Sequence, residues 1–237
     1  MNRITQAALA AVLGTLALPA LASPFTDAEA QLRAVYGDYR AALFLSNAGK
    51  APETAKALAG FDTAWSEMSA QWGTTPPPQY AADAALPQTF DAVSALIGKA
   101  RDEVAAGKLP AAHETLEGVR AEIAGLHERA GLIGFSERMN AYHAAMEEVL
   151  GRDYAAMGPG AAAALAGDAA VLDYLAAQIV ANPAPEAENP AYAPLVDAFA
   201  ASARAFRAAA DSGDVAGALA ARGALKVPYS KLFAQFG

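Results

Sequence analysis

Residues 112–150 read AHETLEGVRAEIAGLHERAGLIGFSERMNAYHAAMEEVL, and this stretch decides how the chain folds. Its apolar side chains recur at intervals of three and four residues, which predicts two helices that each bury one face. The two glycines of residues 131–135 favour a tight turn between these helices. All three histidines of the protein lie in this stretch. We therefore expect a helical hairpin here, and any chemical site of the protein within it.

The remainder of the chain also favours helix. Alanine is its main apolar residue, and few β-branched residues lie between the glycines and prolines that punctuate it. The patterns predict eight helices, at about residues 26–46, 52–72, 87–106, 110–130, 136–157, 161–181, 194–212 and 214–237. We expect an all-α fold of up-down helical hairpins. It forms either two packed four-helix bundles, residues 23–131 and 132–237, or one continuous array.

An internal repeat relates the first two expected hairpins. The first copy consists of Gly49, Lys50, Ala51, Pro52, Leu58, Gly60, Phe61 and Trp65. The second copy, 58 residues later, consists of Gly107, Lys108, Leu109, Pro110, Leu116, Gly118, Val119 and Ile123. A repeated hairpin indicates a duplicated structural unit, and the repeat carries no chemistry of its own. We also expect four aromatic side chains in the core of this half, those of Tyr36, Tyr39, Trp65 and Trp72.

The chain begins with a predicted signal peptide, residues 1–22. Arg3 provides a short positive region, an apolar run follows, and small residues precede a cleavage site after Ala22. The run is shorter than the ~20 residues that cross a bilayer, and we expect no later segment to span one. The absence of cysteine excludes disulfides and covalent haem attachment, and it fits an exported domain. We therefore expect a soluble protein of the bacterial periplasm.

The charge of the mature chain limits its partners. Removal of residues 1–22 from the 237 leaves 215 residues. Because the removed segment holds one Arg and no acid, the net charge changes from −8 to −9. An acidic chain has no electrostatic affinity for nucleic acid or anionic lipid, so we expect neither nucleic acid nor, after cleavage, a membrane as partner. We also expect no enzyme, since the sequence holds no glycine-rich phosphate loop, nucleophile elbow or HExxH helix.

The last expected hairpin carries a family resemblance. A Gly-Asp turn at Gly213 precedes an alanine-rich helix and then LKVPYSKLF, residues 225–233. This arrangement resembles the periplasmic cytochrome c′ family, in which a four-helix bundle ends with a CxxCH haem-attachment motif and an aromatic-basic segment. The chain departs from that motif, because residues 227–231 read VPYSK where the family has its cysteines and histidine. The resemblance implies a bundle fold without covalent haem.

One face of the helix expected at residues 136–157 presents soft metal ligands. Met139, His143 and Met146 are spaced i, i+4 and i+7, so two thioethers and an imidazole share that face. Copper(I) prefers such ligands, whereas Glu147, four residues after His143, suits a harder ion such as zinc or iron. The alternative is structural: the two methionines fill the core, and His143 is half-buried and hydrogen-bonded.

Two His-x-x-x-Glu pairs provide a second metal hypothesis. His113 with Glu117, and His143 with Glu147, could together supply four ligands to zinc, copper or iron. If the two helices are antiparallel neighbours, a rise of about 1.5 Å per residue places His127 and His143 at similar heights near the turn. His113 then lies two turns or more from His143. We therefore expect His127 rather than His113 beside His143, with Glu128 as a further ligand.

These observations favour a non-catalytic binding or accessory protein. The leading cofactor hypothesis is a transition metal ion, copper, zinc or iron, at the hairpin that carries the histidines and methionines. The first alternative is a structural or protein-interaction scaffold that binds a periplasmic protein and no metal. The second is an electron carrier with non-covalent haem b, held by Met and His across a bundle. Ser136, close to the histidines in sequence, is expected to serve as a helix N-cap.

Overall fold

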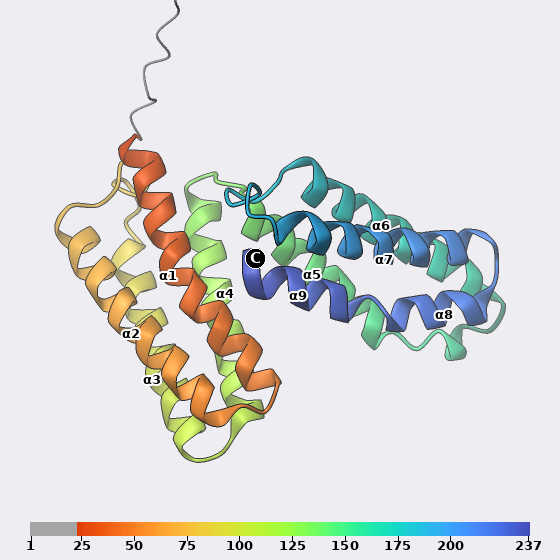
Figure 1. The fold of residues 1–237 in the computed structure, drawn as a ribbon, viewed down its shortest axis with the longest axis horizontal. Coiled ribbons are helices and arrows are strands. Elements are labelled where there is room, and N and C mark those ends of the chain that lie inside the picture. Colours follow the sequence, from red (N-terminus) through yellow and green to blue (C-terminus); the bar gives the residue numbers. More distant parts are fainter. Residues whose placement is uncertain (1–22) are drawn as a thin grey trace, which may run out of the picture.

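The computed structural model describes residues 23–237, so the predicted signal peptide, residues 1–22, lies outside the described part. Residues 23–237 form nine α-helices and one 3-10 helix, which confirms the expected all-α fold (Figure 1). The elements are α1 (Pro24–Asn47), α2 (Ala51–Thr74), α3 (Leu86–Ala105), α4 (Leu109–Arg129), α5 (Phe135–Gly151), the 3-10 helix η1 (Ala155–Gly160), α6 (Ala161–Ala181), α7 (Tyr192–Asp211), α8 (Val215–Gly223) and α9 (Lys226–Phe236).

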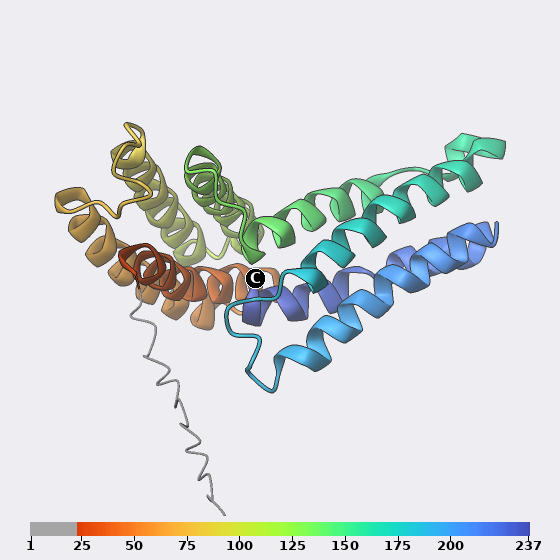
Figure 2. The ribbon, with the colours of Figure 1, turned by 90° about the horizontal axis from the view of Figure 1, so that it is seen from above.

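The helices form two groups that are steeply inclined to one another (Figure 1, Figure 2). Helices α1 to α4 pack together as the first bundle, and α5 to α9 pack together as the second bundle. The α4–α5 connection, which contains the boundary expected at residue 131, joins them. Away from this connection, α1 packs against α9. We call the region where α1, α4, α5 and α9 meet the junction.

Aromatic side chains fill the core of the first bundle. Tyr36, Tyr39, Trp65 and Trp72 are all buried, as expected from the sequence. The indole of Trp65 packs edge-on against Phe90 of α3, with ring centroids 5.9 Å apart, and its Nε1 donates to the Phe90 carbonyl. Small alanines let the helices approach closely, and these large rings supply the apolar area that alanine lacks.

The two copies of the sequence repeat adopt the same turn geometry. Gly49 and Gly107 have φ angles of 73° and 71°, in the left-handed region that favours glycine at the end of a helix. After each glycine, a lysine amide donates back to a helix carbonyl, Lys50 to Leu45 at 3.0 Å and Lys108 to Glu103 at 2.8 Å. In both hairpins, α1–α2 and α3–α4, the first helix therefore ends and the second helix begins in the same way.

Two of the expected helices are shorter in the structure. Helix α5 ends at Gly151 instead of residue 157. The Asp153 carboxylate accepts from the amide of Ala155 and starts a new turn there. Gly158, with a φ of 52°, and Pro159 then interrupt the helical geometry. The last expected helix is divided into α8 and α9. Proline at position 228 lacks an amide proton and its ring clashes with the carbonyl four residues earlier, so one continuous helix is not accommodated.

Helix α6 is the most apolar helix of the described chain. By length and composition alone, Ala155–Ala181 could cross a membrane, which the sequence analysis did not anticipate. In the fold, one face of α6 packs against α5 and α7 and buries Leu165, Leu172 and Ile179. Outside that face, Val171, Tyr174 and Val180 are exposed. The expectation that the mature protein has no membrane partner stays a prediction.

The repeat allows a matched test of core packing. Leu58 and Leu116 occupy equivalent positions in the two hairpins, and both are fully buried. We expect Leu58→Ala and Leu116→Ala each to lower the free energy of unfolding by ~2–5 kcal/mol, because each removes buried methyl groups and leaves a cavity. Urea unfolding followed by circular dichroism measures this. Val227→Ala at a 61% exposed site is the control, with an effect of at most ~0.5 kcal/mol. Equal effects for all three variants would contradict the assignment of the core.

Candidate functional site

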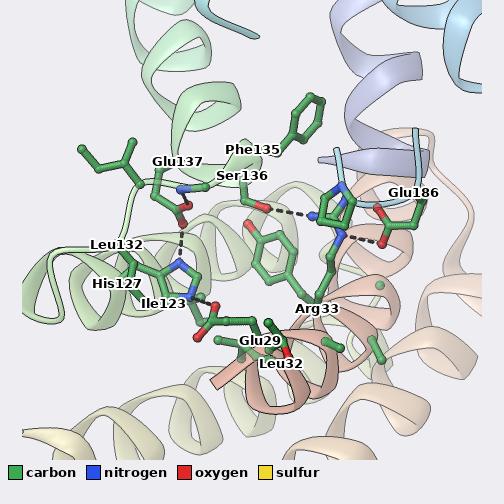
Figure 3. A pocket seen from close by; sticks show the side chains of 18 of the residues that line it. Glu29, Leu32, Arg33, Ile123, His127, Leu132, Phe135, Ser136, Glu137 and Glu186 are labelled. Carbon is green, nitrogen blue, oxygen red and sulfur yellow. Dashed lines mark hydrogen bonds and ion pairs between the residues drawn. The ribbon is translucent and has the colours of Figure 1, made fainter. Parts of the chain in front are cut away.

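A cavity of about 630 Å³ lies at the junction, and we call it the junction cavity. One wall is the face of α1 that runs from Phe25 through Arg33 to Arg40. The C-terminal part of α4, the α4–α5 connection and the first turns of α5 form the opposite wall (Figure 3). Pro185 and Glu186, from the α6–α7 connection, close one side. The cavity is thus built from both bundles.

Apolar side chains make up most of the cavity wall. They come from α1, α4 and the connection between α4 and α5, and include Phe25, Leu32, Ile123, Leu132, Ile133 and Phe135. Along α1 the wall alternates between exposed residues, such as Phe25 and Ala34, and buried residues, such as Leu32, Tyr36 and Arg40. The cavity is therefore open to solvent on one side of α1 and bounded by the core on the other.

A histidine between two carboxylates joins three helices at the edge of this cavity (Figure 3). The Nδ1 atom of His127, on α4, lies 2.5 Å from Glu137 Oε1 on α5. The Nε2 atom lies 3.4 Å from Glu29 Oε2 on α1. We call this group the Glu29–His127–Glu137 clamp. The clamp connects both bundles, because Glu137 belongs to the second bundle and the other two residues to the first.

The clamp holds its imidazole in the charged form. Burial opposes the charge of His127, but the hydrogen bonds and charges of Glu137 and Glu29 outweigh burial and raise its pKa to about 9. Burial likewise opposes ionisation of the two carboxyl groups, and hydrogen bonds from His127 outweigh it and lower the pKa of each. Glu29 also accepts from Tyr80 Oη at 2.7 Å and Gln79 Nε2 at 2.8 Å. The clamp is therefore a charged triad with a net charge of −1.

Arg33 forms a second link between the bundles (Figure 3). Its Nε donates to Glu186 Oε1 at 2.5 Å, and its Nη2 donates to the Phe236 carbonyl of α9 at 2.7 Å. Its Nη1 donates to Ser136 Oγ at 3.4 Å. The N-cap of α5 is Gly134 instead of the expected Ser136, because the Glu137 carboxylate accepts from the Gly134 amide and satisfies the helix start. The Ser136 hydroxyl is therefore free to face the cavity.

A second cavity, of about 370 Å³, lies at the junction near the end of α1. His113, Glu117 and Arg120 of α4 face it together with His143, Met146 and Glu147 of α5. The remaining polar wall comes from α9, with Lys226 and Ser230, and from Asn47 of α1. Both predicted His-x-x-x-Glu pairs thus line the same cavity.

The guanidinium of Arg120 stands between these two pairs. Its Nη1 lies 2.8 Å from Glu117 Oε2 and also contacts His143 Nδ1. Burial and the charge of Arg120 lower the pKa of His143 to about 4, against the opposing charge of Glu147. The neutral His143 ring stacks on Tyr229 at 5.3 Å between centroids. Since a guanidinium has no acceptor, His143 Nδ1 accepts and its Nε2–H faces Glu147 Oε1 at 3.5 Å.

The expected pairing of His127 with His143 is wrong. Residues at equal distances from the α4–α5 turn face one another, so Glu137 lies opposite His127 and Arg120 opposite His143. His143 is six residues further along α5 than Glu137, which is about 9 Å at 1.5 Å per residue. The two helices also diverge from the turn (Figure 1). His127 consequently lines the junction cavity, whereas His143 lines the second cavity together with His113.

The predicted metal ligands do not form one coordination group. Among residues 23–237, no three His, Asp or Glu side chains are gathered so that they could hold a metal ion. The two carboxylates of the clamp face opposite ring nitrogens of His127, so they cannot share an ion with it. Met139 and Met146 are fully buried in the core, and Met139 lines neither cavity. Met139 therefore follows the structural alternative stated above.

The sequence did not single out the α1 wall of the junction cavity. Glu29, Arg33, Tyr36 and Arg40 follow one another at three- and four-residue intervals along a helix. Arg40 falls between the apolar residues Tyr39 and Leu43 of the core stripe, where a solvated arginine is not expected. That placement is the signal in the sequence that marks this wall.

Comparison of the chain with models of protein families, with curated proteins and with solved structures finds no match. The resemblance to cytochromes c′ therefore stays a prediction.

The clamp predicts how stability depends on pH. The pKa of His127 in the folded protein, about 9, exceeds the ordinary value of 6.5. The charged imidazole therefore contributes fully to the free energy of unfolding below pH 6.5, and this contribution is lost as the pH rises through 9. Relative to His127→Gln, the wild-type protein should lose ~3 kcal/mol of unfolding free energy over this range. Urea unfolding of both proteins between pH 5 and 10 measures the difference. If the unfolding free energies of the two proteins change with pH in parallel, the imidazole is not held in its charged form.

Proposed function

We propose that the protein is a non-catalytic binding protein that holds a small, mostly apolar organic molecule in the junction cavity. The observation that carries the proposal is the cavity itself, of about 630 Å³, with apolar walls and a few polar groups at its edge and buried end. Sites for small organic ligands have volumes of roughly 300–1,000 Å³ and this division between apolar walls and sparse polar groups. Sites of this kind also occur where two packed units meet, as they do here.

The chemistry of the wall supports binding rather than catalysis. A general base needs an unprotonated nitrogen or carboxylate free to accept a proton. His127 is held protonated by two carboxylates, and both carboxylates are occupied by that same ring. Ser136 accepts a hydrogen bond from Arg33, a group that cannot remove its proton. These groups fix the shape of the cavity and leave its apolar walls to contact a ligand.

The proposed setting is the periplasm. It rests on the predicted signal peptide, residues 1–22, and on the absence of cysteine from the sequence. A binding protein in that compartment meets its ligand outside the cytoplasm and carries it or senses it there. The acidic net charge keeps such a carrier soluble and free of nucleic acid.

A neutral fluorescent probe tests the proposal. We expect N-phenyl-1-naphthylamine to bind the purified mature protein with one site and increased fluorescence, because the cavity excludes water from an apolar molecule. Ala34→Trp, which places an indole in the cavity wall, should weaken binding roughly 10-fold or more by occupying that space. Ala177→Trp, on the exposed face of α6 and outside both cavities, is the matched control. No saturable binding, or equal loss in both variants, would refute the proposal.

Metal binding is the second candidate, favoured by one observation. His113 and Glu117, and His143 and Glu147, line the second cavity together. His113 Nδ1 lies 3.1 Å from the Leu43 carbonyl, which orients a ring as metal-ligating histidines commonly are. The buried Arg120 opposes this use, since its charge stands between the two pairs and repels a cation.

Equilibrium dialysis separates the two candidates. We expect under ~0.2 equivalents of copper, zinc or iron to remain on the protein after washing, because Arg120 occupies the centre of the metal-ligand set. Elemental analysis of the dialysed protein provides the measurement. If the wild-type protein retains one equivalent of metal and both His113→Ala and His143→Ala lose it, the metal site exists and this expectation is wrong.

A further inference from the structure

The connection between α6 and α7, residues 182–191, is an arm that reaches from the second bundle to the first, and we call it the strap. Its three prolines stiffen it, because each fixes its own φ angle. The strap is anchored in the second bundle at Ala184, which is 3% exposed and whose amide donates to Tyr192 Oη at 3.2 Å. Beyond this anchor, Pro185 and Glu186 line the junction cavity.

One ion pair ties the strap to the first bundle. Arg33 Nε donates to Glu186 Oε1 at 2.5 Å (Figure 3), and within residues 23–237 no other hydrogen bond or ion pair joins the strap to α1–α4. The Glu186 side chain is 45% exposed, whereas that of Arg33 is 13% exposed. An ion pair with one partner in water contributes little to stability and is screened by salt. We call this pair the latch of the strap.

Both members of the latch keep polar partners when the latch opens. Arg33 retains two acceptors, the Phe236 carbonyl at 2.7 Å and the Ser136 hydroxyl at 3.4 Å. Glu186, already half in solvent, exchanges the guanidinium for water. Opening therefore leaves no buried charge without a partner, which is the condition that makes the separation of an ion pair costly.

The edge of the cavity that the clamp forms is held much more firmly. The Glu29–His127–Glu137 clamp joins α1, α4 and α5 there, and its side chains are between 11% and 28% exposed. Withdrawal of the imidazolium would leave two partly buried carboxylates uncompensated. The cavity thus has one edge that a buried group of charges fixes and another edge that a single half-exposed ion pair holds (Figure 3).

We infer that the strap opens and closes one edge of the junction cavity, that the Arg33–Glu186 pair latches it closed, and that release of the latch speeds the entry and exit of the ligand. This inference rests on the proposed function. The cavity is already open to solvent on one side of α1, so release of the strap widens an existing mouth and needs no rearrangement of the two bundles. When the strap closes again, Pro185 supplies an apolar contact to the bound molecule.

Matched variants of the two glutamates of the strap test the latch by stopped-flow fluorescence. We expect Glu186→Gln to raise both the association and the dissociation rate constants of N-phenyl-1-naphthylamine by roughly 2- to 5-fold, as for loss of an exposed ion pair, with a smaller change in Kd. Glu188→Gln is the control, because Glu188 is exposed on the same strap, does not line the cavity and forms no ion pair within residues 23–237. Equal rate constants in the wild type and Glu186→Gln would refute the latch.

Salt provides a second measurement on the same three proteins. Raising the concentration of sodium chloride from about 0.01 to about 1 M shortens the Debye length from about 30 to about 3 Å, and so weakens the latch. We expect the exchange of the neutral probe to become faster with salt in the wild type and in Glu188→Gln, and to stay unchanged in Glu186→Gln. The same acceleration in Glu186→Gln would show that salt acts elsewhere and would overturn the assignment of the latch.

A spin label on the strap tests its opening without any ligand. The sequence holds no cysteine, so Glu188→Cys can be labelled at one site. We expect the electron paramagnetic resonance spectrum of this label to show greater mobility when Glu186→Gln is added, whereas a label at Ala177→Cys on α6 is unaffected. If the probe does not bind, the proposed function fails and the label alone decides whether the strap opens. An unchanged strap label would overturn the inference whether or not the probe binds. Circular dichroism verifies that each variant is folded.

Discussion

The Glu29–His127–Glu137 clamp is the interaction on which the arrangement of the two bundles depends. One charged imidazole on α4 faces a carboxylate of α1 on one side and a carboxylate of α5 on the other. Such a group has little freedom to rearrange, because removing the imidazolium would leave two partly buried carboxylates uncompensated, which costs about 3–5 kcal/mol. It therefore fixes the point from which α5 departs. The direction of α5 in turn sets the positions of α6 to α9, which pack upon it or upon one another.

The divergence of α5 from α4 produces both cavities. Two antiparallel helices that stayed in contact would bury their facing side chains and leave no space between them. Here Arg120 of α4 reaches His143 of α5 across the widening gap and lies over the Phe233 ring of α9 at 4.9 Å. Arg33 of α1 separately links the first bundle to the second. The junction is consequently held by charged and aromatic contacts at its edges, and its interior remains partly open. That open interior is the physical basis of the proposed binding function.

Much of the fold could be predicted from local patterns. The turns at Gly49 and Gly107 were identified because a left-handed residue at a helix end requires glycine, and the burial of Trp65 and Trp72 followed from helical periodicity. The division of the last helix was missed, although Pro228 signalled it, because the apolar spacing continues across the break. For the site, the sequence identified His127 and His143 but assigned them to one another. It placed Tyr36 in the core but did not single out Glu29 or Arg33, whose partners come from distant parts of the chain.

The sequence by itself determined the helical class, the hairpin turns and the buried face of each helix, because these depend on residues within a few positions of one another. Residues 112–150 did specify a hairpin, and its turn register alone places Glu137 opposite His127. Only the tertiary structure decided that the hairpin opens into a cavity, that α1 closes it, and that Arg40 of this wall contacts the main-chain oxygen of Gly237. The physical reason is that charge compensation in a buried site is a property of all the elements that surround it, and contacting residues of those elements are separated by as many as 203 residues.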